Sequence, residues 1–284
     1  MKLSFTKMQG CGNDYIYLNC MEEEPPDPAK LSIRLSDRHF GIGGDGIILI
    51  CPSKIADAKM RIFNADGSEG KMCGNGVRCV GKYLYDSGIA PREEIRVDTL
   101  SGVKLLRMQI RGGKAVGAQV DMGNAVLTPE KIPVCLTGEA IVNYPAEVGG
   151  RQWNITCVSM GNPHCVVFCE NVAELDLEEI GVPFEKSPLF PESVNTEFVR
   201  VVERNHLEMR VWERGSGETL ACGTGACASA VAAVRNGFCD PDEDITVELR
   251  GGVLTIRCTE KTVSMTGPAE TVFTGEVELQ PENK

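Results

Sequence analysis

The chain has 284 residues, of which 42% are hydrophobic and 24% charged, ordinary values for a globular protein and enough for two domains of about 100–150 residues each. Its net charge of −11 disfavours nucleic acid and anionic membrane surfaces as partners, and no apolar run approaches the roughly 20 residues of a membrane span. Because no secretory leader is expected, the 13 cysteines predict free thiols in a reducing cytoplasm rather than disulfides.

Short β-branched segments bounded by glycine and proline predict a strand-rich protein. In chain order, the expected strands are Tyr15–Leu18, Gly46–Ile50, Val116–Val120, Cys165–Phe168 and Gly252–Arg257. The acidic, proline-rich segment Glu22–Pro28 predicts a surface loop. Two helices are expected, Gly76–Asp86 and Gly225–Asn236, each followed by a glycine suited to a C-terminal cap. The second is apolar nearly all round, which is typical of a buried helix.

The chain repeats itself at a nearly constant offset. Met209–Trp212 follows the similar Met60–Phe63 by 149 residues, and Gly252 follows Gly102 by 150 residues. A register held over most of the chain with a single slip indicates an internal duplication. We therefore predict an α/β protein of the α+β type, with two pseudo-symmetric domains that each wrap a strand-rich sheet or barrel around a central helix.

Each repeat contains one cysteine in a Cys-Gly-x-Gly motif. The first predicted domain, residues 1–123, contains Cys73, and the second, residues 124–269, contains Cys222. The C-terminal segment 270–284 is expected to pack back on the first domain. One such cysteine per half suggests a site between the halves, with two thiols facing each other.

The two motifs place a sulfur at the start of a helix, beside unpaired backbone N–H groups and the positive end of the helix dipole. We expect this position to lower the pKa of a thiol. Two such helix ends can hold one carboxylate, with a sulfur on each face of the bound carbon. The pattern predicts removal of a proton from one face and its return to the other, by a coupled thiolate and thiol.

Other interpretations of these motifs are weaker. A single buried cysteine beside glycine is usually structural, but two at equivalent repeat positions favour acid–base chemistry. Cys73 with Cys79, and Cys222 with Cys227, lack the Cys-x-x-Cys spacing of common zinc sites, so no metal is expected. The segment Gly41–Asp45 superficially suggests a phosphate loop. It lacks the Lys-Ser/Thr of that loop and the glycine spacing of a dinucleotide fingerprint.

Several further motifs flank the two cysteines: Gly12–Asp14, Asn64–Ser68, Cys73–Gly76, Gly161–His164, Asn195–Glu197, Glu213–Gly215 and Glu218–Gly225. With these motifs the chain closely resembles the diaminopimelate epimerase family, from Met8 to about Gly275. The resemblance implies two pseudo-symmetric α/β domains and a cofactor-independent enzyme. Such enzymes interconvert LL- and meso-diaminopimelate, a small-molecule substrate, in lysine and peptidoglycan-precursor biosynthesis. The resemblance also implies a homodimer.

By this resemblance, Cys73 and Cys222 are the two acid–base residues, and His164 lies near the catalytic site. The substrate-binding positions that the resemblance implies are Asn13, Asn64, Gly74, Asn75, Asn162, Asn195, Glu213, Arg214, Gly223 and Thr224. Diaminopimelate has a second amino-acid end, so Arg214 can clamp a distal carboxylate and Glu213 can pair with an ammonium.

The chain departs from the family at Gly46, where many members have glutamine, so no side chain contacts a ligand there. The nearest rival function is a proline or hydroxyproline racemase, whose first motif usually carries histidine in place of Asn75. The rival from another class is a non-enzymatic thiol protein for redox or metal sensing. Metal content and the effect of alkylation on proton exchange would separate that class from an epimerase.

Overall fold

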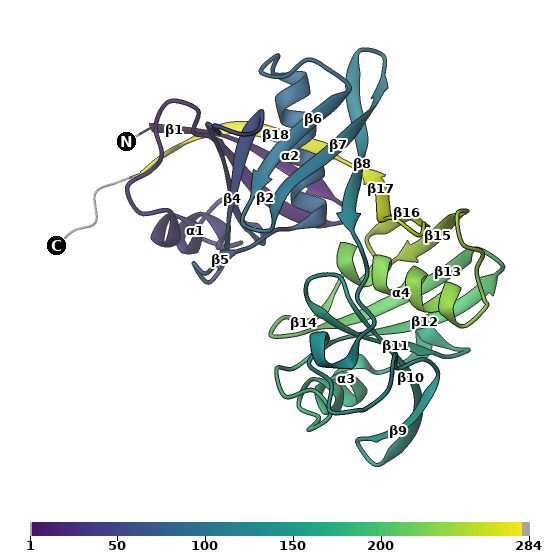
Figure 1. Ribbon diagram of the computed structural model, residues 1–284. Coiled ribbons are helices and arrows are strands. Elements are labelled where there is room, and N and C mark those ends of the chain that lie inside the picture. Colours follow the sequence, from purple (N-terminus) through teal and green to yellow (C-terminus); the bar gives the residue numbers. More distant parts are fainter. Residues whose placement is uncertain (1, 280–284) are drawn as a thin grey trace. The chain divides into compact units, whose positions relative to one another are not determined.

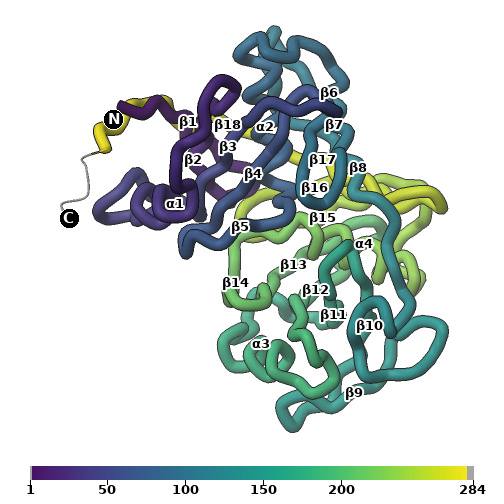
Figure 2. Tube along the Cα trace, turned by 60° about the vertical axis from the view of Figure 1, so that its left-hand side comes forward, coloured from purple at the N-terminus to yellow at the C-terminus, as the bar shows by residue number. Residues whose placement is uncertain are grey.

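The computed structural model describes residues 2–279. The chain divides into two compact units, which Figures 1 and 2 colour along the sequence: unit 1 within Met1–Val120 and Gly267–Lys284, and unit 2 within Asp121–Thr266. Both limits fall three residues before the domain boundaries expected from the sequence. We propose that the units are the two expected domains.

Unit 1 is built on strands that neighbour one another in the order β18-β1-β2-β3-β4-β6-β7-β8, and β5 also pairs with β4. Only the pairs β2–β3 and β4–β6 are parallel among those of this unit. The bounds are β1 Lys2–Gly10, β2 Asn13–Asn19, β3 Gly46–Cys51, β4 Ala58–Asn64, β5 Glu69–Gly70, β6 Glu94–Thr99, β7 Gly102–Arg111, β8 Lys114–Gly123 and β18 Glu270–Glu278. Strand β18 thus returns the C-terminal segment to β1, and residues 280–284 of that segment lie outside the described residues.

Unit 2 repeats this arrangement in the order β9-β10-β11-β12-β13-β15-β16-β17, and β14 also pairs with β13. Its parallel pairs, β11–β12 and β13–β15, are the counterparts of those in unit 1. The bounds are β9 Tyr144–Val148, β10 Arg151–Ser159, β11 Pro163–Phe168, β12 Asn195–Glu203, β13 His206–Glu213, β14 Gly217–Thr219, β15 Asp244–Leu249, β16 Gly252–Cys258 and β17 Val263–Pro268. The short turns η1 (Pro129–Lys131) and η2 (Val172–Glu174) complete it. The shared topology confirms the predicted α/β duplication.

Each unit buries one central helix against its strands. Helix α2, Gly74–Asp86, contacts β1, β2, β6 and β7, and helix α4, Gly223–Arg235, contacts strands from β10 to β16. Both predicted helices are confirmed, although each begins two residues earlier than expected because the Cys-Gly-x-Gly glycines form its first turn. Gly88 and Gly237 follow the helix ends with φ of 77°, the left-handed conformation expected of a C-terminal glycine.

A second helix in each unit was not expected from the sequence. Helix α1, Pro28–Ser36, starts at a proline after the N-cap Asp27, at the end of the segment expected to be a loop. Helix α3, Leu177–Glu185, contains Pro183, which normally argues against a helix interior. They begin 149 residues apart, as α2 and α4 do, so they belong to the same duplication.

Each unit has its own hydrophobic core. In unit 1, buried side chains of α1 such as Leu31 and Leu35 pack on Ile47 and Leu49 of β3. In unit 2, Phe184 of α3 packs with Phe198 of β12, the ring centroids lying 5.8 Å apart. Among the described residues, no helix is long and apolar enough to cross a membrane.

Candidate functional site

Cys73 and Cys222 are the N-caps of the central helices α2 and α4. The sulfur of Cys73 accepts a hydrogen bond from the amide of Gly76 at 3.3 Å, and the sulfur of Cys222 accepts one from the amide of Gly225 at 3.4 Å. Both cysteines have extended backbone angles, as an N-cap residue requires. The first-turn amides that follow each sulfur have no acceptor in the helix itself, so they can bind an anion.

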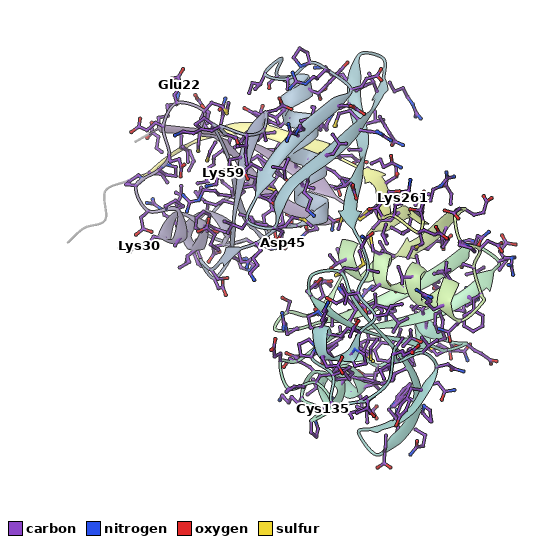
Figure 3. All side chains as sticks on the ribbon, in the orientation of Figure 1. Glu22, Lys30, Asp45, Lys59, Cys135 and Lys261 are labelled. Atoms are coloured by element: carbon purple, nitrogen blue, oxygen red, sulfur yellow. The ribbon has the colours of Figure 1, made fainter. Side chains whose placement is uncertain are left out.

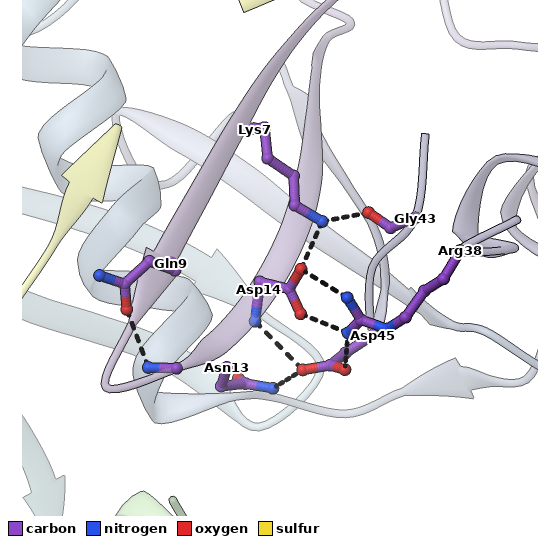
Figure 4. A network of polar contacts seen from close by, with 8 residues as sticks. Lys7, Gln9, Asn13, Asp14, Arg38, Gly43 and Asp45 are labelled. Carbon is purple, nitrogen blue, oxygen red and sulfur yellow. Dashed lines mark hydrogen bonds and ion pairs between the residues drawn. The ribbon is translucent and has the colours of Figure 1, made fainter. Parts of the chain in front are cut away.

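In unit 1, Cys73 lies beside two of the expected binding asparagines. Its thiol donates to Asn13 Oδ1 at 3.2 Å. Asn13 Nδ2 in turn donates to Asp45 Oδ2 at 2.7 Å, as Figure 4 shows. Asn75 is buried in the first turn of α2, where its side-chain oxygen accepts from Arg78 at 3.0 Å. Asn64, also expected to bind substrate, lies at the end of β4 and is held by Ser68 at 3.0 Å.

In unit 2, a chain of side-chain contacts leads to Cys222. Buried Glu197 contacts His164 Nδ1 at 2.7 Å, and His164 Nε2 contacts Asn162 Oδ1 at 3.1 Å. Asn162 Nδ2 then donates to Thr224 Oγ1 at 3.3 Å, and that hydroxyl lies 3.5 Å from the sulfur of Cys222. The structure therefore places His164, expected near the site, in the second layer behind Asn162.

The remaining expected residues of unit 2 gather where β12 begins and β13 ends. Asn195 donates to the Pro163 carbonyl at 3.0 Å and accepts from the backbone amide of Arg214 at 2.9 Å. The guanidinium of Arg214 is exposed and donates to the carbonyl of Glu192 at 2.7 Å. Its planar fork is therefore accessible to a carboxylate. Glu213 accepts a hydrogen bond from the hydroxyl of Thr219.

The expectation that the helix end lowers the thiol pKa is wrong for Cys222. Burial raises the pKa of the Cys222 thiol well above its ordinary value, and the carboxylates of Glu213 and Glu197 raise it further. The hydrogen bonds from Thr224 and from the amide of Gly225 act in the opposite direction but are weaker. The neutral thiol is thus the favoured form of Cys222.

The pKa of the Glu213 carboxyl is also shifted. Burial raises the pKa of its carboxyl above the ordinary 4.5, against the lowering effect of hydrogen bonds with Thr219 and Cys222. The raised folded-state pKa means that its contribution to stability is fully present below pH 4.5 and is lost as the pH rises through the folded-state value.

We therefore expect Glu213→Gln to unfold at a higher temperature than the wild type at neutral pH, with a difference that shrinks towards pH 4. Thermal melts across that range measure it. Glu260→Gln, an exposed glutamate of the same unit, provides the control and should show no such pH-dependent gain. A Glu213→Gln difference that stays constant with pH would contradict this assignment.

The family departure at Gly46 has a structural cause in this chain. Gly46 pairs with Tyr15 on one side and Asn64 on the other, and a Cβ atom here would overlap the carbonyl oxygen of Phe63. The same Cβ would lie 2.9 Å from the ring of Tyr15. The backbone around Gly46 therefore leaves no room for the glutamine that the family resemblance suggests at this position.

We expect Gly46→Gln to destabilise unit 1 by about 1–3 kcal/mol rather than to restore a substrate contact. Urea unfolding measures the loss, and kcat/KM measures any gained contact. An unchanged unfolding midpoint would show that the backbone makes room for the side chain.

Sequence reasoning missed the residues that hold the expected ones in place. These are Asp45 behind Asn13, Arg78 behind Asn75, Glu197 behind His164, and Thr219 behind Glu213. Glu197 carried a usable signal, because a carboxylate in the buried first half of the strand that begins at Asn195 must find a buried partner. Thr219 lies within the recognised motif Glu218–Gly225 but was given no role of its own, and Arg78 lies outside every recognised motif. Within residues 2–279, no three His, Cys, Asp or Glu side chains gather so as to hold a metal ion.

The sequence matches the family model described as diaminopimelate epimerase over residues 5–128 and 156–272. A diaminopimelate epimerase of Acetivibrio thermocellus is 54% identical over 279 residues, which cover 98% of this chain and 99% of the relative. One of Methanococcus maripaludis is 50% identical and covers 98% and 100% of the two chains. This chain belongs to the diaminopimelate epimerase family.

Solved structures with low sequence identity share the fold. A phenazine biosynthesis protein of the PhzF family from Bacillus anthracis matches with a TM-score of 0.71 at 14% identity, covering 98% of this chain and 100% of the other. A hydroxyproline epimerase from Agrobacterium vitis, solved with bound trans-4-hydroxy-L-proline, matches with a TM-score of 0.64 at 15% identity, covering 97% and 91%. At these identities the likeness establishes the fold alone.

Proposed function

We propose that this chain interconverts LL- and meso-diaminopimelate by removing the α-proton from one face of the carbon and returning a proton to the other. Cys73 and Cys222 are the acid–base pair. The observation that carries the proposal is their equivalence: in a member of this family, each repeat places one sulfur at the N-cap of its buried helix. The step needs no redox change, because a proton leaves to one sulfur and another proton comes from the second.

The helix ends supply the stabilisation that a weakly acidic α-proton requires. The first-turn amides at Gly74–Asn75 and Gly223–Thr224 are suited to the α-carboxylate, on which negative charge develops as the proton leaves. The raised pKa of Cys222 supports its role as the proton donor when Cys73 is the base. In the reverse direction the two sulfurs exchange roles.

In this proposal, the non-reacting end of the substrate is bound by charged and amide side chains. Glu213 pairs with the distal ammonium, and Arg214 binds the distal carboxylate through two parallel hydrogen bonds. The side-chain amides of Asn64, Asn162 and Asn195 contribute neutral hydrogen bonds. Asn13 supplies a hydrogen-bond partner at the reacting end. A proline-like substrate offers neither distal group, which favours diaminopimelate over a cyclic amino acid.

The deciding experiment is incubation of the purified protein with LL-diaminopimelate in deuterated water, followed by chiral separation and mass measurement of the product. We expect meso-diaminopimelate that carries deuterium at the inverted carbon. L-Proline and trans-4-hydroxy-L-proline serve as parallel substrates. Racemisation of these with no turnover of diaminopimelate would replace the proposal with the racemase alternative.

We propose that the reaction is independent of cofactors, since two thiols and two helix ends account for the chemistry. Purified protein should lack cofactor absorbance in the near ultraviolet and visible, and it should keep full activity after chelation. A rate that falls on chelation and recovers with added metal would overturn this part of the proposal.

We further propose a homodimer, from the family resemblance, and a cytoplasmic location, from the free thiols expected of the cysteines. Light scattering on the eluted protein should give twice the mass of one chain. Cell fractionation should recover the chain with the cytoplasmic proteins.

A further inference from the structure

The glycine-rich segment 41–46 contributes no side chain to the proposed reaction. It joins α1 to β3, and its backbone is fixed from two sides: the amide of Asp45 donates to the carbonyl of Asp14 at 2.7 Å, and the amide of Ala65 donates to the carbonyl of Asp45 at 3.0 Å. Gly44 packs closely on β2, since a Cβ there would lie 3.0 Å from the backbone carbonyl oxygen of Asp14. The packing of this segment places Asp45, labelled in Figure 3, against β2.

Both carboxylate oxygens of Asp45 are engaged as acceptors (Figure 4). Oδ2 accepts from Asn13 Nδ2 at 2.7 Å and from the backbone amide of Asp14 at 3.1 Å. Oδ1 accepts a hydrogen bond from the guanidinium of Arg38 at 3.0 Å. The same guanidinium donates two hydrogen bonds, of 2.7 and 3.2 Å, to the carboxylate of Asp14. Lys7, which is buried, forms an ion pair with Asp14 and so fixes the far side of this network.

An ionised carboxylate only accepts hydrogen bonds, so Asn13 must turn its N–H group towards Asp45 and its oxygen away. That oxygen lies 3.2 Å from the sulfur of Cys73. We infer that Asp45 is a positioning residue that fixes the side-chain amide of Asn13 with its oxygen towards Cys73. The inference rests on the proposed function in taking Cys73 as an acid–base residue.

The second repeat shows that this orientation does not follow from the shared fold. Its equivalent asparagine, Asn162, points the other way, with the oxygen towards His164 and the N–H group towards Thr224. The position equivalent to Asp45 is Val194, a buried apolar residue. The two repeats therefore diverged at the residue that sets the direction of the amide.

The orientation has a chemical consequence at Cys73. An amide oxygen accepts a hydrogen bond from a thiol but repels a thiolate, so it favours the protonated sulfur. A bound α-ammonium group offers the same oxygen a stronger donor and releases the thiol from it. Asp45 thereby favours a ligand that carries an ammonium on the reacting carbon. Binding of that ammonium frees the thiol of Cys73 to lose its proton.

The test is the pH dependence of alkylation at individual cysteines, measured by quantitative peptide mapping after short exposures to iodoacetamide. In Asp45→Ala and Asp45→Asn, Asn13 can turn its N–H group towards the sulfur. We expect the pH midpoint for alkylation of Cys73 to fall by about half a pH unit or more, the effect of one hydrogen bond. Cys135, an exposed cysteine of unit 2 labelled in Figure 3, is the internal reference in every sample and should not shift.

Asp14→Asn is the matched control, because it removes a carboxylate from the same network without touching the Asn13 amide. A midpoint for Cys73 that stays unchanged in both folded Asp45 variants, or that falls equally in Asp14→Asn, would overturn the inference. In the second case the effect would be one of charge alone. The alkylation profiles need no turnover, so failure of the wild type to epimerise diaminopimelate would count against the proposed function and leave this test intact.

Discussion

Replacing either Cys73 or Cys222 by alanine is expected to abolish epimerisation while leaving both units folded. Loss of an essential acid–base group typically costs about 10²–10⁴-fold in rate or more. The two-sulfur mechanism loses the whole inversion in either variant, because each face of the carbon depends on one sulfur. Removing a small N-cap side chain costs only about 1 kcal/mol of helix stability, so inactivity should not reflect unfolding.

Turnover of LL-diaminopimelate in deuterated water measures this loss, with circular dichroism to verify folding. Cys227→Ala is the matched control on helix α4, since Cys227 is buried one turn beyond Cys222. Cys135→Ser is the exposed control. Both should retain near-wild-type rates. Comparable turnover by Cys73→Ala or Cys222→Ala would eliminate the two-base mechanism.

The serine variants add a finer distinction. Cys73→Ser and Cys222→Ser keep a hydrogen-bonding side chain of similar shape at the N-cap but lose the acidity of the thiol. We expect poor turnover with some residual exchange of the α-proton. Full activity in a serine variant would mean that shape and not proton transfer is required at that position.

The duplication was the most predictable property of the fold, because identical or similar residues recur along the chain at a nearly fixed offset. The paired Cys-Gly-x-Gly motifs placed both central helices, and Gly88 and Gly237 marked their ends. Helices α1 and α3 could not be predicted in the same way. Pro183 lies inside α3 and argues against a helix there. For α1, the Asp27–Pro28 pair is a helix-start signal, but it lies at the end of an acidic, proline-rich segment that favours a loop.

The candidate site divides along a similar line. Residues of the recognised motifs could be named from the sequence, whereas the direction of the Cys222 pKa shift could not. That shift depends on burial and on two carboxylates, Glu213 and Glu197, which the fold brings to one sulfur. Local helix-end reasoning considered only the amide dipoles, and burial outweighs them at this position. The role of Asp45 was equally hidden, because it depends on which end of an amide faces the sulfur.

Removing the guanidinium of Arg214 is expected to lower kcat/KM for diaminopimelate by about 10²-fold, the effect of losing a charge-assisted hydrogen-bond pair. The side chain is exposed, and its one described side-chain bond, to the Glu192 carbonyl, leaves donors for a ligand. Arg214→Lys should recover only part of the loss, because an ammonium cannot form the planar fork.

Substrates that lack one distal group, measured with the wild type and with each variant, separate a loss of binding from a loss of folding. Lysine is diaminopimelate without the distal carboxylate, so its slow α-proton exchange should fall little further in Arg214→Ala. α-Aminopimelate lacks the distal ammonium and should instead be insensitive to Glu213→Gln. If Arg214 and the distal carboxylate form one contact, the two deletions are non-additive, because either one alone already removes it. Equal losses for diaminopimelate and lysine in Arg214→Ala would place the arginine away from the distal end and make its role general to the unit.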